Sequence, residues 1–221
     1  MSWPVNPRSR RSASKSKILS KQFSRYGILF VVSAPSGAGK STLCDALRQT
    51  PDFVYSVSCT TRAARAGEID GEDYHFLSEP DFLARVAAGE FLEHAIVHGK
   101  FYGTLRDPIL KNLHHGIDVL IDIDTQGATA IRDYDDAFVR QALADVFIMP
   151  PDLEELRRRL TKRGTETPVQ IEVRLQTAAR EMEHWRDYRY TIISRSVEED
   201  LLKFRHIMGA ERYLSSRMVL A

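Results

Sequence analysis

A glycine-rich loop between a predicted strand and a predicted helix carries the clearest chemistry in this sequence. The apolar run 28–32 predicts a strand buried on both faces, and the pattern Ala34-x-x-x-x-Gly39-Lys40-Ser41 follows it directly. The glycines of this loop allow successive backbone N–H groups to point at one anion, and the helix that follows adds free N–H donors. Lys40 can reach the β- and γ-phosphates of a nucleotide, and the Ser41 hydroxyl can bind Mg²⁺.

The alternative for this loop is an ordinary strand-to-helix turn with a solvated lysine, which the flanking strand and helix pattern disfavours. We therefore predict that the loop binds a nucleoside triphosphate. The predicted site consists of Ala34, Pro35, Ser36, Gly37, Ala38, Gly39, Lys40, Ser41 and Thr42.

Two acids at the end of another buried-type strand form a second candidate site. Asp122 and Asp124 follow the apolar residues 119–121, and this strand is expected to lie beside the phosphate-loop strand. Acids at the end of a buried strand have little structural purpose, because burial penalises the charge. One acid can hold Mg²⁺ directly or through water, and the other can hold the loop or a second nucleotide. The sequence leaves open which acid has which role, although Asp122 and Ser41 are our predicted metal ligands.

The elements that must position these residues alternate between strands and helices. The predicted strands of the sheet are 28–32, 53–59, 119–124, 145–149 and 190–194. The predicted helices are 42–49, 79–88, 105–115, 127–134, 153–162, about 169–188 and about 198–217. Short strands are expected within 91–103, and the polar stretch 60–76 is expected to be a loop with a short hairpin. This alternation predicts an α/β fold with a mainly parallel five-stranded sheet flanked by helices.

Composition limits the class of protein. The chain has 221 residues, of which 43% are hydrophobic and 28% charged, as is usual for a soluble globular protein. No apolar run is long enough to cross a membrane, so no membrane partner is expected. Cys44 and Cys59 have neither metal-ligand spacing nor a disulfide framework, which favours a reducing compartment. Cytoplasm is therefore the expected location. The oligomeric state stays open, and a homo-oligomer is compatible with the sequence.

The net charge of +1 conceals an uneven distribution of charge. Residues 1–25 carry seven Lys or Arg side chains and no acid, while the rest of the chain has a net charge of −6. We predict that residues 1–24 form a disordered basic arm ahead of a domain at 25–221. A solvated tail is the favoured interpretation, and a mitochondrial transit peptide is the alternative. Nucleic acid is not an expected partner, beyond non-specific contact through this arm.

Three stretches in the same order carry a family resemblance. They are Ser36-Gly-Ala-Gly-Lys40, Ser58-Cys-Thr-Thr-Arg62-Ala-Ala-Arg65-Ala-Gly67-Glu68 and Asp122-Ile-Asp124-Thr-Gln126-Gly127, with Glu93 and Tyr102-Gly-Thr104 between them. Together they resemble the guanylate kinase family over about residues 26–213. The resemblance implies a P-loop NTPase fold with a core, a GMP-binding segment at about 58–106 and a lid at about 152–188. It also implies Mg²⁺-dependent transfer of a phosphoryl group from ATP to GMP. We expect dGMP as a second acceptor, but the sequence leaves its use open.

The resemblance assigns an acceptor site that the residue types can explain. Arg62 and Arg65 lie on a glycine-punctuated loop and can bind a monophosphate bidentately, although exposed loop arginines are the alternative. Hydroxyl donors from the same segment would join them on the phosphate. The GMP-binding set implied by the resemblance is Ser58, Arg62, Arg65, Glu68, Tyr74, Glu93, Tyr102, Gly103, Thr104, Asp122 and Asp124.

Glu93 is the residue expected to select the base. Guanine offers N1–H and the N2 amine side by side, and a carboxylate can accept from both, whereas adenine presents an acceptor at N1. Thr104 could donate to guanine O6, as the family match suggests. A site with such partners rejects the wrong base, because its own polar groups would stay unpaired. The alternative for Glu93 is a surface acid that follows a helix.

Cations from the lid complete the predicted catalytic set. Phosphoryl transfer depends on positioning and charge neutralisation, so several cations should surround the transferred group. In the family the lid arginines close over ATP, but helix arginines are as often solvated or paired with acids. The predicted catalytic residues are Lys40, Arg62, Arg159, Arg163 and Arg174.

Two departures and two rival functions accompany the resemblance. Ala34 replaces the first glycine of the phosphate-loop pattern, and Ser194-Arg195 stands where family members usually carry Asn-Asp, which leaves the adenine contacts open. One rival is a non-catalytic binding module of the same fold, which would typically have a degraded phosphate loop. The other is a kinase for a different phosphorylated acceptor, which would not need Glu93 or Thr104.

Overall fold

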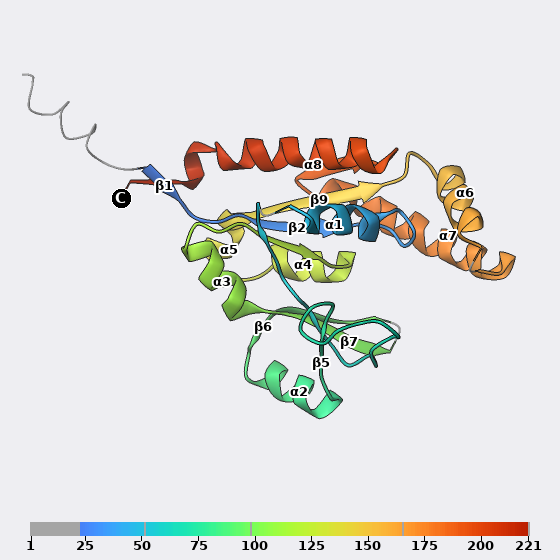
Figure 1. The fold of residues 1–221 in the computed structure, drawn as a ribbon, viewed down its shortest axis with the longest axis horizontal. Coiled ribbons are helices and arrows are strands. Elements are labelled where there is room, and N and C mark those ends of the chain that lie inside the picture. The colour runs from blue at the N-terminus through green and yellow to red at the C-terminus, as the bar shows by residue number, and fades with distance from the viewer. Residues whose placement is uncertain (1–22, 51, 98, 165, 221) are drawn as a thin grey trace, which may run out of the picture.

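The centre of the molecule is a parallel sheet. A computed structural model of the chain describes residues 23–50, 52–97, 99–164 and 166–220 (Figure 1). Every neighbouring pair of strands in this sheet is parallel, which confirms the predicted α/β architecture. The strands in spatial order are β10 (Tyr190–Ile193), β9 (Leu143–Met149), β2 (Leu29–Ser33), β8 (Val119–Asp122) and β3 (Val54–Tyr55).

The central strand β2 faces two cores because its side chains alternate between the faces of the sheet. Ile28, Phe30 and Val32 point into one core, while Leu29 and Val31 point into the other, and all five are fully buried. A strand that is apolar on both faces needs helices on both sides. This is why the sequence shows a continuous apolar run here instead of alternation.

Helices cover both faces of the sheet, as Figure 1 shows. Helices α1 and α8 supply the side chains of the first core, and α3, α4 and α5 supply those of the second. The flanking helices are α1 (Lys40–Arg48), α3 (Arg106–His114), α4 (Thr125–Arg132), α5 (Ala137–Ala142) and α8 (Val197–Arg212).

A separate small unit, residues 58–106, lies below the core in Figure 1 and is called the inserted segment here. It has its own four-stranded sheet in the order β5-β4-β7-β6 and its own small core, in which Phe82 and Phe91 stack 4.5 Å apart. Ser78 caps its helix by accepting a hydrogen bond from the Asp81 N–H. Its elements are β4 (Cys59–Thr60), β5 (His75–Phe76), α2 (Glu79–Ala87), β6 (Phe91–Val97) and β7 (Lys100–Leu105).

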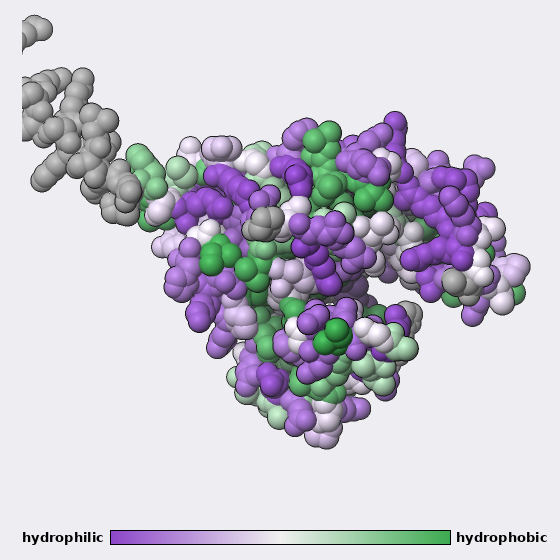
Figure 2. Space-filling view, viewed as in Figure 1, coloured by the Kyte–Doolittle hydropathy of each residue, from purple (hydrophilic) through white to green (hydrophobic). Residues whose placement is uncertain are grey.

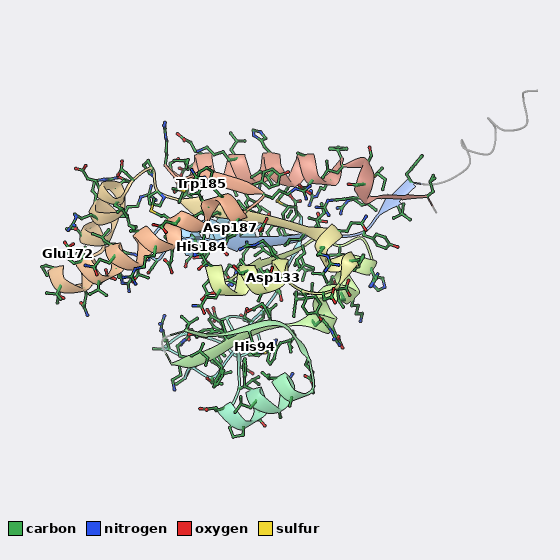
Figure 3. The ribbon with its side chains drawn as sticks, turned by 180° about the vertical axis from the view of Figure 1, so that it is seen from behind. His94, Asp133, Glu172, His184, Trp185 and Asp187 are labelled. Atoms are coloured by element: carbon green, nitrogen blue, oxygen red, sulfur yellow. The ribbon has the colours of Figure 1, made fainter. Side chains whose placement is uncertain are left out.

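Two helices project from the core beyond the carboxyl end of β9, at the right in Figure 1, and are called the lid here. They are α6 (Leu153–Arg163) and α7 (Pro168–Met182), which pack through a small apolar cluster of their own. Arg157 on α6 forms an ion pair with Glu172, which Figure 3 places toward the outer end of α7. The surface of the lid is mostly hydrophilic, and a wide notch separates it from the inserted segment (Figure 2). The lid therefore touches the core at its base and leaves its outer surface to solvent.

Several element boundaries differ from the sequence prediction. The predicted strand 53–59 is two strands, β3 and β4, because the chain leaves the central sheet there and enters the inserted segment. The predicted helix to residue 188 is α7 followed by a 3-10 helix at Glu183–Asp187. The predicted last helix ends at Arg212 instead of residue 217, and the buried Arg217 side chain turns back to pair with Glu211. The short helix α5 was not predicted at all.

The two ends of the described chain meet in a small antiparallel sheet. Strand β1 (Phe23–Arg25) pairs with β11 (Met218–Leu220) after the 3-10 helix Ser215–Arg217. Phe23 and Ser24, which the sequence analysis assigned to the basic arm, lie in this sheet. Residues 1–22 of that arm are outside the described residues. Among the described residues, no helix is long and apolar enough to cross a bilayer.

Candidate active site

The phosphate loop connects β2 to α1, as the sequence predicts. Gly37 and Gly39 have φ angles of 87° and 102°, which residues with a side chain rarely adopt. A Cβ atom at Gly37 would also lie 2.7 Å from the Leu160 side chain of the lid helix α6. Glycine at this position is therefore required both by the loop conformation and by contact with the base of the lid.

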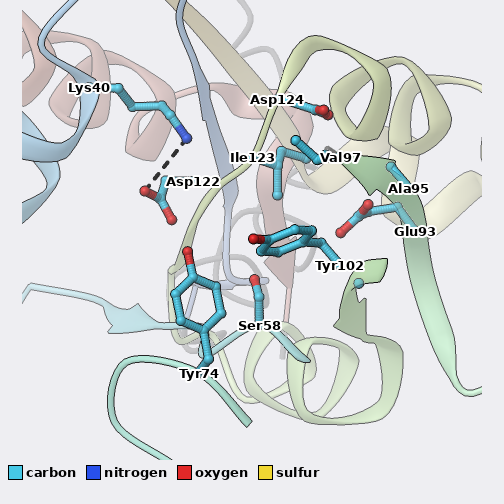
Figure 4. A pocket seen from close by; sticks show the side chains of 11 residues that line it. Lys40, Ser58, Tyr74, Glu93, Ala95, Val97, Tyr102, Asp122, Ile123 and Asp124 are labelled. Atoms are coloured by element: carbon cyan, nitrogen blue, oxygen red, sulfur yellow. Dashed lines mark ion pairs between the residues drawn. The ribbon is translucent and has the colours of Figure 1, made fainter. Parts of the chain in front are cut away.

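Lys40 and Asp122 meet because their strands are neighbours. In the register of β2 and β8, Val32 lies opposite Asp122, so the carboxyl end of β8 faces the start of the phosphate loop. The Lys40 Nζ atom is 3.6 Å from Asp122 Oδ2, as drawn in Figure 4. Both side chains are about one-quarter exposed, so this pair faces the open site instead of the core.

A cavity of about 240 Å³ lies between this pair and the inserted segment. Figure 4 shows hydroxyl groups of Ser58, Tyr74 and Tyr102 on the side of the inserted segment, opposite Lys40. Three apolar side chains, Ala95, Val97 and Ile123, complete the lining. Residues from the predicted site that line the cavity are Lys40, Ser58, Tyr74, Glu93, Tyr102, Gly103, Asp122 and Asp124.

Glu93 lies at the far end of this cavity and is only 6% exposed. Its Oε1 atom accepts a hydrogen bond of 2.5 Å from the Thr104 hydroxyl. Burial raises the pKa of the Glu93 carboxyl to about 7, and the Asp124 carboxylate adds to the increase while the Thr104 bond opposes it. The sequence analysis expected Thr104 to donate to guanine O6, but here its hydroxyl proton points to Glu93.

The two predicted acids at the end of β8 have different contacts. Asp122 pairs with Lys40, whereas Asp124 caps α4 and accepts a 2.8 Å hydrogen bond from the Gly127 N–H. Asp124 therefore fixes the start of α4, and α4 lies against Glu93. The two acids thus differ in their protein contacts, and which of them binds the metal or the second nucleotide stays a prediction.

Gly127 is the point where α4 touches the Glu93 carboxylate. A Cβ atom built on Gly127 would lie 2.9 Å from Glu93 Oε2 and 3.2 Å from Ile123 Cδ1. Real Cβ atoms essentially never come within 3.0 Å of another heavy atom, so a side chain here would push the carboxylate away. The absence of a side chain at residue 127 thus helps to place Glu93.

Replacement of Gly127 by Ala should weaken binding of the acceptor nucleotide and leave binding of ATP unchanged. We expect the KM for the acceptor to rise about tenfold, since displacement of one charged hydrogen-bond acceptor is worth roughly 1–3 kcal/mol. Steady-state kinetics with each nucleotide varied in turn would measure this. Gly209→Ala on α8 is the matched control, because nothing lies within 4 Å of its Cβ position. Equal kinetic changes in both variants would contradict the role of Gly127.

The arginine loop of the inserted segment is held by Glu68 in this structure. The Arg62 guanidinium donates two hydrogen bonds of 2.9 Å to Glu68 and lies over the rings of Tyr74 and Phe76. Glu68 also accepts from the Arg65 backbone N–H at 2.7 Å, while the Arg65 side chain is exposed. The structure therefore brings Glu68 to Arg62 as an ion-pair partner. An incoming phosphate would have to share Arg62 with this carboxylate.

A second cavity, of about 550 Å³, lies on the other side of the phosphate loop. Its wall includes Gly39 and Thr42 from the loop, Arg159 and Arg163 from α6, and Ser194 after β10. Lys40 lines the first cavity, and the nearby loop residues Gly39 and Thr42 line the second, so both cavities adjoin the same stretch of the loop.

The three predicted lid arginines have different environments. Arg159 donates to the carbonyl of Ala38 at 3.1 Å and to the carbonyl of Ser194 at 3.0 Å, so it ties α6 to the phosphate loop. Arg163 lines the second cavity. Arg174 on α7 pairs with Glu166 at 3.1 Å and lines neither cavity. The structure does not bring Arg174 to the loop in this conformation.

Some contacts of the site were missed by sequence reasoning. Tyr55 donates a hydrogen bond to Asp122, and Glu181 on α7 accepts a 3.0 Å hydrogen bond from the Ser36 N–H. Gly127 was recognised within a motif but was not assigned to the site. A tyrosine inside the predicted strand 53–59 is a weak signal for Tyr55, and nothing in a helical sequence marks Glu181.

Comparisons with known proteins agree with this geometry. The guanylate kinase family model matches residues 26–211. A curated guanylate kinase from Maricaulis maris is 46% identical over 189 residues, which cover 85% of this chain and 85% of the relative. One from Clostridium perfringens is 41% identical over 195 residues, covering 87% of each chain.

A solved structure of a guanylate kinase also matches the chain. The crystal structure of guanylate kinase from Anaplasma phagocytophilum matches with a TM-score of 0.74 and 37% identity, covering 90% of this chain and 93% of that one. The matched region includes the phosphate loop, the inserted segment and the lid. On these grounds the chain belongs to the guanylate kinase family of nucleoside monophosphate kinases, a family of enzymes that phosphorylate GMP.

Proposed function

We propose that this chain transfers the γ-phosphoryl group of ATP to GMP, and also to dGMP, to give ADP and the nucleoside diphosphate. One observation carries the proposal: Lys40 of the phosphate loop and the buried Glu93 line the same cavity. The lysine suits the transferred phosphoryl group, and the carboxylate suits the base of the acceptor. GMP joins these two features within one molecule, because its phosphate and its guanine lie at opposite ends.

The reaction proceeds by positioning and charge neutralisation. A phosphate oxygen of GMP attacks the γ-phosphorus of ATP, the bond to the β-phosphate oxygen breaks, and ADP leaves. The backbone N–H groups at Gly39 and the start of α1 would face the donor phosphates. Lys40 lines the first cavity and directly follows Gly39, which lines the second. Arg62 and Arg65 bind the acceptor phosphate once Arg62 exchanges part of its contact with Glu68. The lid carries Arg163 and Arg174 over the donor and excludes water when it closes.

The residues near the loop fit a bound Mg²⁺. Mg²⁺ prefers oxygen ligands and is usually held by one or two protein groups together with substrate phosphates. The Ser41 hydroxyl in the first turn of α1 and the Asp122 carboxylate at the end of β8 are such groups, and both line one cavity. The described residues contain no cluster of three or more acidic, histidine or cysteine side chains that could hold a metal by themselves. When bound, the ion would neutralise charge on the β- and γ-phosphates.

Base selection rests on Glu93 in its ionised form. A carboxylate can accept from guanine N1–H and N2–H together, and it would face the unprotonated N1 of adenine. Thr104 holds Oε1 of Glu93, and Gly127 leaves room for Oε2. A buried acid held from two sides can discriminate strongly, because the wrong base would leave it unpaired.

A single assay tests the proposal. ADP formation from ATP and Mg²⁺ would be followed in a coupled reaction with GMP, dGMP, AMP, ribose 5-phosphate or no acceptor. We expect turnover with GMP and dGMP and at least a 10³-fold lower kcat/KM with AMP. Similar turnover with ribose 5-phosphate would favour a kinase for another acceptor, and no turnover with any acceptor would favour a binding module. The intact phosphate loop and the ion pair of Lys40 with Asp122 favour catalysis over that module.

A further inference from the structure

A tyrosine outside the predicted site contacts one of its central acids. Tyr55 is the last residue of β3, the edge strand next to β8, and its backbone pairs with Leu120. Its hydroxyl donates a short hydrogen bond to Asp122 Oδ1. Among the described residues, Asp122 accepts a side-chain hydrogen bond from no other group.

The two oxygen atoms of Asp122 have different partners. Tyr55 binds Oδ1, and Lys40 Nζ is 3.6 Å from Oδ2. A carboxylate turns easily about its terminal torsion, so a contact to one oxygen fixes where the other points. With Oδ1 bound to Tyr55, Oδ2 faces the side of the phosphate loop. Each oxygen keeps a second lone pair, so the arrangement leaves room for a further ligand.

Tyr55 is itself held in place by an arginine. The Arg48 guanidinium of α1 lies over the Tyr55 ring, 3.7 Å from its centroid, which is a favourable cation–π distance. Arg48 and Tyr55 line a polar cavity of about 270 Å³ together with Asp122 and Ser41.

We infer that Tyr55, stacked against Arg48, is a positioning residue that orients the Asp122 carboxylate toward Lys40 and the nucleotide phosphates. The inference rests on the proposed function, since it assigns Asp122 to phosphoryl transfer. Three elements converge on one carboxylate: β3 brings the tyrosine, α1 brings Arg48 and the loop lysine, and β8 brings the acid. An orienting bond of this kind affects the transition state more than substrate binding, because the charge to be neutralised grows during transfer.

The test is the variant Tyr55→Phe, which removes the hydroxyl and keeps the ring under Arg48. We expect kcat to fall about tenfold, the effect of one lost hydrogen bond to a charged group, with the KM for GMP changed less than twofold. Tyr213→Phe is the matched control, because Tyr213 is 86% exposed and directly follows the end of α8 at Arg212. Arg48→Met should lower kcat by a smaller factor, and Arg48→Lys should restore much of it, since lysine keeps a cation near the ring.

Binding supplies a readout independent of turnover. Titration of a non-hydrolysable ATP analogue with and without Mg²⁺ gives the affinity gained from the metal, and Tyr55→Phe should reduce this gain about tenfold. The inference is overturned if Tyr55→Phe keeps the wild-type kcat and the wild-type gain from Mg²⁺, even when its melting temperature falls. A wild-type protein that binds the analogue but never phosphorylates GMP would refute the proposed function, and the titration would then decide the role of Tyr55 alone.

Discussion

Lys40→Ala should reduce kcat for GMP phosphorylation about 10³-fold, the loss seen when one preorganised charge-stabilising group is removed from an active site. Lys40 lines the first cavity next to the loop residue Gly39, which lines the second, and its Nζ atom lies 3.6 Å from Asp122. Removal of the ammonium leaves that carboxylate facing the phosphates without a neutralising partner. Repulsion between the Asp122 carboxylate and the phosphates then adds to the loss of attraction between Lys40 and the phosphates. The KM values should change much less than kcat, because the charge on the transferred group is greatest in the transition state.

The fold should survive this substitution. Lys40 is partly exposed and belongs to neither core cluster, so its truncation leaves no buried cavity. Lys111→Ala on α3 is the matched control, because this lysine is exposed and lies outside both cavities. Steady-state kinetics and a thermal melt of each variant give the comparison. A Lys40→Ala protein with kcat within tenfold of wild type would contradict our placement of the reaction at the loop.

The sequence predicted best those features that depend on local pattern. The apolar run predicts a buried strand, and the structure has β2 there. The loop glycines predict a tight turn with positive φ angles, and the structure has these too. The acids of β8 were also placed correctly, because neighbouring parallel strands end at the same edge of a sheet. In each case the information lies within a few residues of the side chain concerned.

Contacts between distant elements were harder to predict. Tyr55 reaches Asp122 across 67 positions of the chain, and Glu181 reaches Ser36 across 145. Pairings of this kind depend on how helices and edge strands pack, which periodicity does not encode. The predicted strand 53–59 shows the same limit, since the register decides that its two halves join different sheets. The hydrogen bond from Thr104 to Glu93 was not predicted either, and donation from Thr104 to guanine O6 stays a prediction.

Glu93→Gln should lower kcat/KM for GMP about 10²-fold and leave the KM for ATP within twofold of wild type. The amide has one acceptor oxygen instead of two, and its NH₂ group would face a guanine donor. The lost charged hydrogen bond and the unsatisfied donor are together worth roughly 2–4 kcal/mol. Glu154→Gln on α6 is the matched control, because that carboxylate is exposed and lines neither cavity. Equal losses toward GMP and ATP would show that Glu93 supports the fold instead of selecting the base.

The pH dependence of binding gives an independent test of the same carboxylate. Because burial raises the pKa of Glu93 to about 7 from an ordinary value of 4.5, the empty protein binds more protons than the unfolded chain between these values, and its stability falls as pH rises through this window. A guanine base needs the ionised form, so its affinity should fall about tenfold between pH 8 and pH 6, where about one molecule in ten remains ionised. Guanosine is the ligand to use, since it lacks the phosphate group that titrates near pH 6. Glu93→Gln should bind guanosine weakly and with no such dependence on pH. If the wild-type affinity for guanosine is constant from pH 6 to pH 8, binding of the base is not linked to ionisation of Glu93, and this prediction is wrong.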